Sequence, residues 1–417
     1  MSPGPDPGPG LVDRPRGERQ PGQRSPGRAL SRLGVTDREV LGWWAITRLG
    51  LLAVLAMAPA VFAPLNAPPG STPSLGLALT RWDAVHFATI AQYGYTPGVP
   101  AAQQPTGVPL EAFFPGFPGL LAAFHVVGLP YALTGVLSGL VFGAVAAIAL
   151  ARLARLEPGA DADPALGSRA ALLWMLAPVA VFVAVPYSEA PFLGLAFPAW
   201  LAARHRRWWL ACLLAAGASC FRISGLYLAV ALAVQFLVTQ LGDRGSARAR
   251  RDWRLVPLFV VPVLPIVGFF AYLWAASGNP RLWFDVQAQV WNRTFTLPWD
   301  SVATTWASAF GQHQAPDYAW MFGAELVALA VGTALTVVLL IRRRWAEACF
   351  VGLQLISYAT SYWLMSVPRA GLIWWPLWTM AAVALGRRPW LLRGWLVVSG
   401  SLAAVWAAAF LRSQWAG

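Results

Sequence analysis

The stretch RWDAVHF, residues 81–87, places a cation, a carboxylate and an imidazole within two helical turns, among aromatic side chains. Asp83 and His86 are three residues apart, so a helix would present both on one face. There the carboxylate can accept a proton from a hydroxyl group, and the imidazole can bind a phosphate, a metal or the same substrate. The structural alternative is an interfacial helix in which Asp83 caps the helix or pairs with Arg81.

Further isolated ionisable side chains lie near the ends of apolar runs. Glu189 lies in PYSEAPF, Arg222 in FRISGL and Arg369 in SVPRAG, while Arg293 lies in a longer polar stretch. An ionisable group near hydrocarbon is costly, so each is a functional candidate. Guanidinium groups bind phosphate through paired hydrogen bonds, which suits a lipid phosphate. The alternatives are snorkelling of the arginines to headgroups, and a structural ion pair for Glu189.

The composition indicates an integral membrane protein. The chain has 417 residues, is 57% hydrophobic and only 12% charged, and has a mean hydropathy of +0.54. Apolar runs of about 17 to 25 residues recur, each long enough to cross a bilayer. The formal charge of +13 comes from arginines grouped between these runs, as in the cytoplasmic loops of polytopic proteins. Without a soluble basic module carrying interleaved aromatics, a nucleic-acid partner is not expected.

We expect an all-α polytopic membrane domain at residues 39–417, preceded by a disordered cytoplasmic tail at residues 1–38 that is rich in Pro, Gly and Arg. A first span at residues 43–62 leads to an outer loop at residues 63–131. Within that loop, residues 113–129 are apolar but short and broken by prolines. This pattern favours a juxtamembrane helix over a full crossing.

The arginine clusters predict the remaining topology. If residues 113–129 do not cross, every cluster falls on the cytoplasmic side, with about eleven spans and a cytoplasmic N-terminus. A second outer loop is then expected at residues 277–319. The later spans are expected at residues 132–151, 170–186, 188–203, 208–221, 225–240, 255–275, 320–341, 346–365, 371–386 and 394–411. This topology brings the four ionisable motifs together at the extracytoplasmic surface of the cell membrane.

Several motifs in one order resemble a known family. WDAVHFATIAQYGY, AFFPGFPGLL, APVAVFVAVPYSEAPF and FRISGL are similar to motifs of the phosphatidylinositol-glycan class V (PIG-V, GPI mannosyltransferase 2) family, including its bacterial members. GNPRLWFDVQAQVWNRTFTLPW and SVPRAGLIWWPLW resemble the bacterial branch, so the likeness runs from about Trp82 to Leu377. The resemblance implies the membrane-embedded GT-C glycosyltransferase fold, with juxtamembrane helices in the first extracytoplasmic loop.

The resemblance also implies a reaction. It is transfer of mannose, with inversion, from polyprenyl-phosphate-mannose to a lipid-linked or other extracytoplasmic acceptor. Asp83 matches the acid in the first outer loop that is the usual catalytic candidate. One departure is that bacterial relatives tend to have Arg-Tyr where this chain has Arg369-Ala370.

We therefore expect Asp83 to act as the general base on the acceptor hydroxyl. The residues expected to contact donor or acceptor are Trp82, His86, Glu189, Arg222, Arg293 and Arg369, with Arg222 and Arg369 holding the lipid phosphate. A phosphate group leaves readily, so no cofactor is required, although a divalent cation is compatible with the site. The expected partners are the donor, a lipid or glycan acceptor and membrane lipid.

Two other function classes compete with this interpretation. A polytopic lipid or sugar transporter, or a flippase, predicts ionisable groups near the centres of spans and paired broken helices in two related halves. A non-catalytic subunit of a glycosyltransferase complex predicts that Asp83 tolerates replacement by Asn. Polar groups at the ends of the expected spans favour the enzyme.

Overall fold

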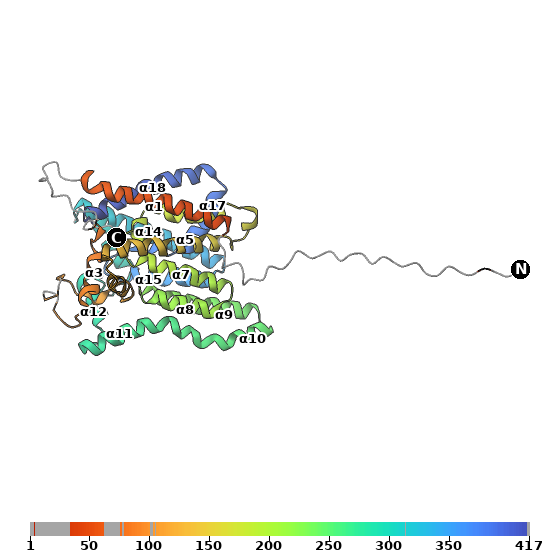
Figure 1. Ribbon diagram of the computed structural model, residues 1–417, viewed down its shortest axis with the longest axis horizontal. Coiled ribbons are helices and arrows are strands. Elements are labelled where there is room, and N and C mark those ends of the chain that lie inside the picture. Colours follow the sequence, from red (N-terminus) through yellow and green to blue (C-terminus); the bar gives the residue numbers. More distant parts are fainter. Residues whose placement is uncertain are drawn as a thin grey trace.

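The structure is a computed structural model that describes residues 34–61, 79–100, 103–104, 106–312 and 314–414, together with Gly4 and Gly76. Most of the expected tail, residues 1–38, therefore lies outside the described residues. In the described part, all regular structure is helical, and long helices run side by side in one bundle (Figure 1). The all-α fold class is confirmed.

Several helices are long and apolar enough to cross a membrane. Within the described residues six such candidates occur, in α1 (Val35–Val61), α5 (Tyr131–Ala154), α9 (Ser224–Gly242), the run from α10 to α11 (Ala247–Ser277), α14 (Pro316–Ile341) and α18 (Pro389–Leu411). Shorter apolar helices are α8 (Trp208–Ser219) and α17 (Trp375–Gly386). The multi-pass membrane architecture is confirmed, while the expected count of eleven spans is not.

Small residues bring the central helices together. In the pair formed by α5 and α7 (Glu189–Arg204), a Cβ at Gly194 would lie 2.7 Å from the carbonyl oxygen of Phe142. On α5, a Cβ at Gly143 would overlap the ring of Trp44 from α1. Such close backbone approach is how membrane helices gain contact in the absence of a hydrophobic drive between them. The Gly-rich sequence of α5 thus fixes the centre of the bundle.

The structure corrects one expected span, residues 170–186. This segment is instead a short helix α6 (Leu166–Met175), a turn and the 3-10 helix η4 (Ala180–Val183). The carbonyl groups left without helical partners where α6 ends need other hydrogen-bond donors inside a membrane protein. Arg48 of α1 donates to the carbonyl oxygen of Met175 at 2.7 Å, and Ser399 of α18 donates to that of Leu176 at 2.6 Å. This interruption between α6 and α7 ends where α7 begins, so it positions the side chains that directly precede Glu189.

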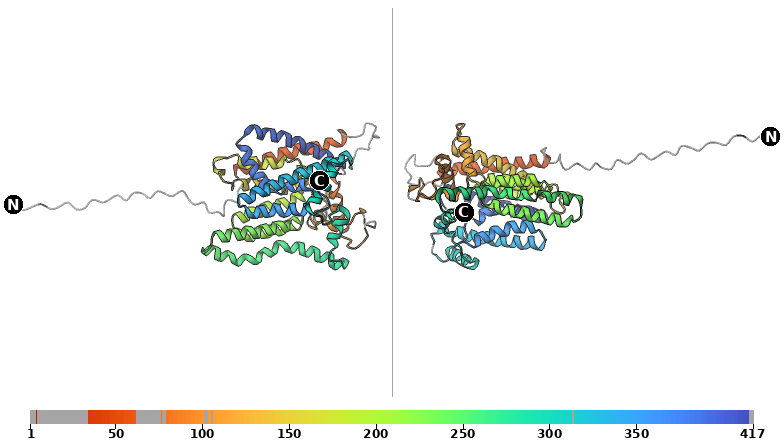
Figure 2. Two further views of the ribbon diagram at one scale, coloured as in Figure 1. Left: turned by 180° about the vertical axis from the view of Figure 1, so that it is seen from behind. Right: turned by 90° about the horizontal axis from the view of Figure 1, so that it is seen from below.

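The outer-loop helices gather at one end of the bundle (Figures 1 and 2). The first loop forms α3 (Asp83–Tyr93), η2 (Leu110–Ala112) and α4 (Gly116–His125), while the second forms α12 (Leu282–Trp291) and α13 (Pro298–Phe310). With 10 residues, α4 extends only about 15 Å, too short to cross a bilayer. The expectation of a short, non-crossing helix in this loop is therefore met. α10 lies at the opposite end of the bundle (Figure 1).

Candidate active site

A cavity of about 430 Å³ lies where the outer-loop helices meet the bundle. Its walls come from α3, α12, α14, the turns that precede α7 and α9, and the segment from α15 (Trp345–Ala359) to α16 (Val367–Gly371). Aromatic rings dominate these walls, and they include Trp82, Phe113, Phe182, Tyr187, Trp283, Trp291, Tyr318 and Trp363. A cavity with apolar walls and a few convergent polar groups is the usual form of a small-molecule site.

The charged groups of the wall are unequal in number. Asp83 is the one acid among the described residues that line the cavity, and Arg222, Arg293 and Arg369 are its cations. The lining therefore has a net positive charge, which suits an anionic ligand such as a phosphate. Trp82 also lines the cavity, so five of the seven residues expected at the site lie in its wall.

Arg369 links the cavity acid to the protein interior. Its Nη2 lies 3.2 Å from Oδ2 of Asp83, and its Nε donates to Oε1 of Glu189 at 2.9 Å. The guanidinium carbon lies 4.5 Å from the ring centroid of Phe182 and 5.1 Å from that of Tyr187. These contacts fix the plane of the guanidinium group from both the charged and the aromatic side. Asp83 is therefore held by Arg369 and not by Arg81, which was the structural alternative.

Glu189 lies behind the cavity wall. Its side chain is 0% exposed and is not part of the lining. Oε1 of Glu189 contacts Nη1 of Arg222 at 2.7 Å as well as Arg369, and Arg222 also donates to Oγ of Ser188 at 3.1 Å. The structural ion pair foreseen for Glu189 is therefore present, with two arginines instead of one. The expected direct contact between Glu189 and a sugar is replaced by a role in holding these two guanidinium groups.

Backbone strain occurs directly before Asp83. Trp82 has φ 54° and ψ −128°, a conformation that a tryptophan rarely adopts. Asp83 begins α3, and its N–H donates to the hydroxyl oxygen of Tyr187 at 3.3 Å. The turn thus aims the first residue of α3 at Arg369 while Trp82 covers the cavity. Strain of this kind is typical of functional sites.

His86 takes a different place from the one expected. Its ring packs against Phe113 with centroids 5.1 Å apart, and it is not part of the cavity lining. Burial lowers the pKa of His86, and the Asp83 carboxylate opposes this shift only in part. A neutral imidazole beside an aromatic ring supports the packing of the outer loop, so the expected substrate contact of His86 does not follow from this position.

Arg293 is the cavity cation for which the described residues provide no counter-ion within ion-pair distance. Among the described residues it forms no ion pair, and its buried Nε has no hydrogen-bond partner. Its guanidinium carbon lies 5.7 Å from the ring centroid of Tyr358. By contrast, Arg222 and Arg369 are neutralised by Glu189 and Asp83. Arg293 therefore accounts for much of the unbalanced positive charge of the lining.

Two groups at the site were not foreseen from the sequence. The Tyr187 hydroxyl group contacts the start of α3, and its ring packs against Arg369. Glu325 of α14 contacts the start of α16 from behind the wall. A signal existed for Glu325, since it is the one charged residue in the apolar run at residues 318–341. Tyr187 gave no such signal, because an aromatic residue beside a span end usually serves as an interfacial anchor.

Metal-binding groups are a separate question. In the part of the chain that the structure describes, no three side chains among His, Cys, Asp and Glu gather as ligands for an ion. The two acids nearest the cavity, Asp83 and Glu189, are both bound to arginine. Metal dependence of this site stays a prediction.

Comparison with known proteins places this site in context. Residues 71–276 match the model of the family described as mannosyltransferase (PIG-V). The chain is 37% identical over 222 residues to mouse GPI alpha-1,6-mannosyltransferase 2, covering 46% of this chain and 41% of the mouse protein. The human protein of that name is 36% identical over 163 residues, 36% of this chain and 29% of that protein. The matches thus span less than half of these relatives.

The fold is shared with a solved structure. The crystal structure of ArnT from Cupriavidus metallidurans bound to undecaprenyl phosphate superposes with a TM-score of 0.50, over 89% of this chain and 70% of that chain. The sequence identity is 15%, so the likeness concerns the fold alone. It supports the GT-C type of helical bundle expected from the sequence.

The family match covers only part of the site. Asp83, Glu189 and Arg222 lie within residues 71–276, whereas Arg293 and Arg369 lie beyond them. The acid of the cavity and the ion pair between Glu189 and Arg222 therefore come from the matched region, whereas Arg369, the partner of Asp83, and Arg293 come from the C-terminal half. Through residues 71–276, the chain is therefore similar to the mannosyltransferase (PIG-V) family.

Proposed function

We propose that this protein is an inverting mannosyltransferase that uses polyprenyl-phosphate-mannose as its donor. The observation that carries the proposal is the charge of the cavity wall, where the described lining residues comprise a single carboxylate, Asp83, and three guanidinium groups. One acid suits removal of one proton from an acceptor hydroxyl group, and a surplus of cations suits a phosphate that leaves with additional negative charge. The family match supports mannose as the transferred sugar.

Asp83 acts as the general base. Its side chain is 24% exposed, so it is open to the cavity, while Arg369 holds Oδ2 at 3.2 Å. In the reaction, the acceptor O–H proton passes to Asp83 as the acceptor oxygen forms a bond to the anomeric carbon. The bond from that carbon to the phosphate oxygen breaks, and the electron pair leaves with the polyprenyl phosphate.

The stereochemical outcome follows from the number of acids. Retention through a covalent intermediate needs two carboxyl groups on the reacting sugar. Among the described lining residues only Asp83 is an acid, since Glu189 is buried behind the wall. A single displacement with inversion needs only the base, because a phosphate leaving group does not need protonation at neutral pH. The site therefore favours inversion.

Arg293 is the group that we assign to the lipid phosphate, with Arg222 and Arg369 nearby. Arg293 has no counter-ion among the described residues, so a phosphate would meet a free guanidinium group and displace no ion pair. ArnT, which has the same type of fold, was crystallised with undecaprenyl phosphate bound to it. That precedent supports a lipid-linked donor for this chain.

Orientation and acceptor belong to the same proposal. We place the cavity on the extracytoplasmic side and the N-terminus in the cytoplasm, because arginine clusters such as Arg342–Arg344 lie at the other end of the bundle. The acceptor is lipid-linked, as the names of the curated relatives indicate for those proteins. A divalent cation is not required by the arrangement of the described residues, since guanidinium groups provide the positive charge.

The test is mannose transfer from synthetic polyprenyl-phosphate-mannose to a lipid extract of the host. Purified wild type is compared with Asp83→Asn at equal folded yield, and Asp300→Asn serves as a control because Asp300 is an exposed acid of α13 that does not line the cavity. We expect transfer by wild type and by the control, and collapse in Asp83→Asn. Equal activity of all three proteins would remove Asp83 from the mechanism.

The competing functions give different results in the same assay. A transporter or flippase would move the donor across a proteoliposome membrane without forming a mannosylated product. A non-catalytic subunit would show no transfer alone, and Asp83→Asn would support activity of the reconstituted complex. Detection of a mannosylated lipid with the pure protein separates the enzyme from both.

A further inference from the structure

Glu325 is a buried carboxylate that the reaction above does not use. It lies on α14, the same helix that gives Tyr318 and Phe322 to the cavity wall, and it is 0% exposed. The surrounding span, Tyr318–Ile341, is long and apolar enough to cross a membrane. A carboxylate in such surroundings is costly, so its contacts must account for its presence.

The two oxygens of Glu325 cap one short helix. Oε1 accepts a hydrogen bond from the N–H of Ser366 and Oε2 from that of Val367, both at 2.7 Å. These residues begin α16, the five-residue helix that carries Arg369. The next residue is Pro368, which has no N–H, so the carboxylate satisfies the free donors at this end. Inside a membrane protein these donors would otherwise lack partners.

The capped turn has little support of its own. Ser366 has φ 69°, in the left-handed region, and its side chain makes no capping hydrogen bond. The five residues of α16 form little more than one turn, with Ala370 N–H bonded to the Ser366 carbonyl oxygen at 3.1 Å. Short helices are unstable without external contacts. The direction of α16, and hence of Arg369, therefore depends on Glu325.

We propose that Glu325 is a positioning residue for the reaction, which sets the guanidinium group of Arg369 and, through it, the carboxylate of Asp83. This assignment rests on the proposed function, in which Asp83 is the base. The chain of contacts is short: Glu325 binds the two residues that begin α16, and Arg369 follows two residues later. Arg369 then contacts Oδ2 of Asp83 at 3.2 Å and 3.3 Å.

A double-mutant cycle on kcat/KM tests the proposal. Glu325→Gln keeps the side-chain volume but offers one acceptor oxygen in place of two, so we expect a loss of about 10- to 100-fold from misplacement of Arg369. Arg369→Gln removes the guanidinium group itself. If Glu325 acts through Arg369, the double variant is no slower than Arg369→Gln alone. Losses that multiply in the double variant would overturn the proposal.

The control cycle pairs Arg369→Gln with Glu347→Gln. Glu347 is also a buried glutamate, 4% exposed, but it contacts Arg344 at the other end of the bundle. This pair is expected to give losses that simply multiply. If Glu325→Gln yields little folded protein, Glu325→Asp replaces it in the same double-mutant cycle. Glu325→Asp keeps the negative charge but shortens the side chain by one methylene group.

The pH–rate profile separates positioning from a loss of folded protein. The titratable or charged groups near Arg369 or Asp83 are Glu189, Arg222, Arg293, Glu325, Tyr187 and His86. A base that loses its neighbouring cation keeps its proton more readily, so the acid limb of Glu325→Gln moves to higher pH, as in Arg369→Gln. An acid limb that stays in place, as expected from loss of folded protein, would contradict the proposal. A shift of the acid limb to lower pH, as expected if only the negative charge of Glu325 is removed, would contradict it as well.

A stability measurement keeps this test separate from the proposed function. The same cycle on the apparent Tm in detergent needs no substrate, and we expect the two substitutions to lower the Tm by less in combination than the sum of the single effects. If wild type transfers no mannose but this coupling is present, the proposed function fails and the link between Glu325 and Arg369 stands. Additive Tm shifts would remove that link whatever the enzyme transfers.

Discussion

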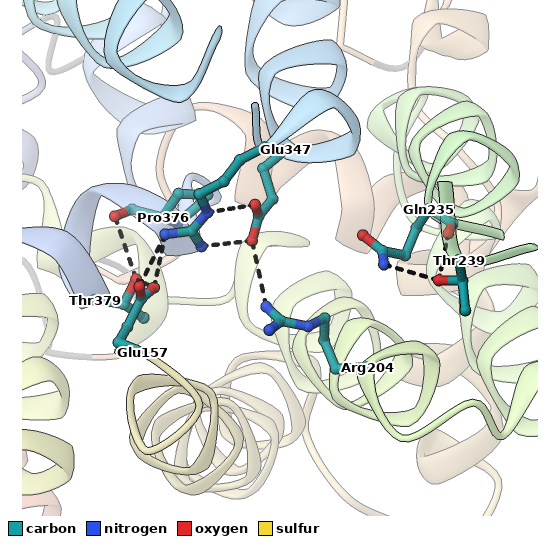
Figure 3. Close-up of polar contacts among 8 residues, drawn as sticks. Glu157, Arg204, Gln235, Thr239, Glu347, Pro376 and Thr379 are labelled. Carbon is teal, nitrogen blue, oxygen red and sulfur yellow. Dashed lines mark hydrogen bonds and ion pairs between the residues drawn. The ribbon is translucent and has the colours of Figure 1, made fainter. Parts of the chain in front are cut away.

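Two clusters of arginine and glutamate lie at the two ends of α7. Glu189 begins this helix at the cavity, and Arg204 ends it about 22 Å away by helix geometry. At the second end, Arg344 binds Glu347 through Nε at 2.5 Å and Glu157 through Nη1 at 2.9 Å, while Arg204 lies 3.7 Å from Glu347 (Figure 3). Both clusters bury charge in an apolar bundle, yet they differ in what remains unpaired.

The cluster at Arg344 is closed. Its guanidinium group meets a carboxylate on either side, and Glu157 also accepts from the hydroxyl group of Thr379 at 2.7 Å (Figure 3). The cluster at Arg369 is open, because Asp83 is 24% exposed and Arg293 nearby has no counter-ion among the described residues. Similar residue types thus form a matched set of charges at one end of α7, and at the other end leave an acid and a cation facing the cavity of the proposed site.

The largest effect is expected from the open cluster. Asp83→Asn removes the base without changing the size of the side chain, so we expect mannosyl transfer to fall about 1,000-fold. The apparent Tm should change little, since Asp83 is partly exposed. Transfer rates per folded molecule and thermal unfolding in detergent test both parts. A large fall in Tm with unchanged turnover would reverse the comparison between the two clusters.

The closed cluster should show the opposite pattern. Arg344→Gln leaves Glu157 and Glu347 buried without their common cation, which is expected to cost about 3 kcal/mol of stability. Turnover per folded molecule should stay near the wild-type value. The measurement is thermal unfolding together with transfer by the monodisperse fraction. A selective loss of turnover would assign this end of the bundle a part in the reaction.

Arg293 is expected to act on donor affinity. Arg293→Gln removes the free guanidinium group, and we expect the donor KM to rise about 10- to 100-fold with a smaller change in kcat. Arg281→Gln is the matched control, because Arg281 is an exposed arginine of the same outer segment that does not line the cavity. Titration with polyprenyl phosphate gives the same comparison without turnover. Equal affinities of the two variants would contradict the phosphate assignment.

Glu111 provides a third case for this comparison, because it is a buried carboxylate with no arginine partner among the described residues. It is 1% exposed, and burial raises its pKa above the ordinary value of 4.5. The folded state therefore holds this proton more tightly than the unfolded chain, and stability falls as pH rises above 4.5. Glu111→Gln should raise stability by about 1 kcal/mol at pH 7 and have little effect at pH 4. Unfolding at the two pH values tests this, and equal effects at both would contradict it.

Several features of the site were predictable from residue types. The charges at Asp83, Glu189, Arg222 and Arg369 lie at the ends of apolar segments, where their cost indicates a function, and the structure brings all four together. The prolines after residue 113 predicted the short helix α4. The cost of a charge in hydrocarbon and the effect of proline are local properties, so a single sequence reveals them.

Other features depended on partners distant in sequence. The expected span at residues 170–186 is broken, because Arg48 and Ser399 supply hydrogen bonds that no local pattern announces. His86 shares a helix with Asp83 but packs against Phe113 outside the cavity lining. The Ser366 turn depends on Glu325, 41 residues earlier. Helical spacing predicts which residues share one face of a helix. It does not predict which residues of other segments that face contacts.

By itself, the sequence determined that this is a polytopic helical membrane protein and indicated Asp83 as its candidate acid, because hydrophobicity and isolated charge are properties of each segment. The tertiary structure decided which charges neutralise one another. It pairs Glu189 with Arg222 and Arg369 behind the wall, and leaves Asp83 and Arg293 facing the cavity. The energy of an ion pair depends on distance and burial, and these arise only when separate helices pack together.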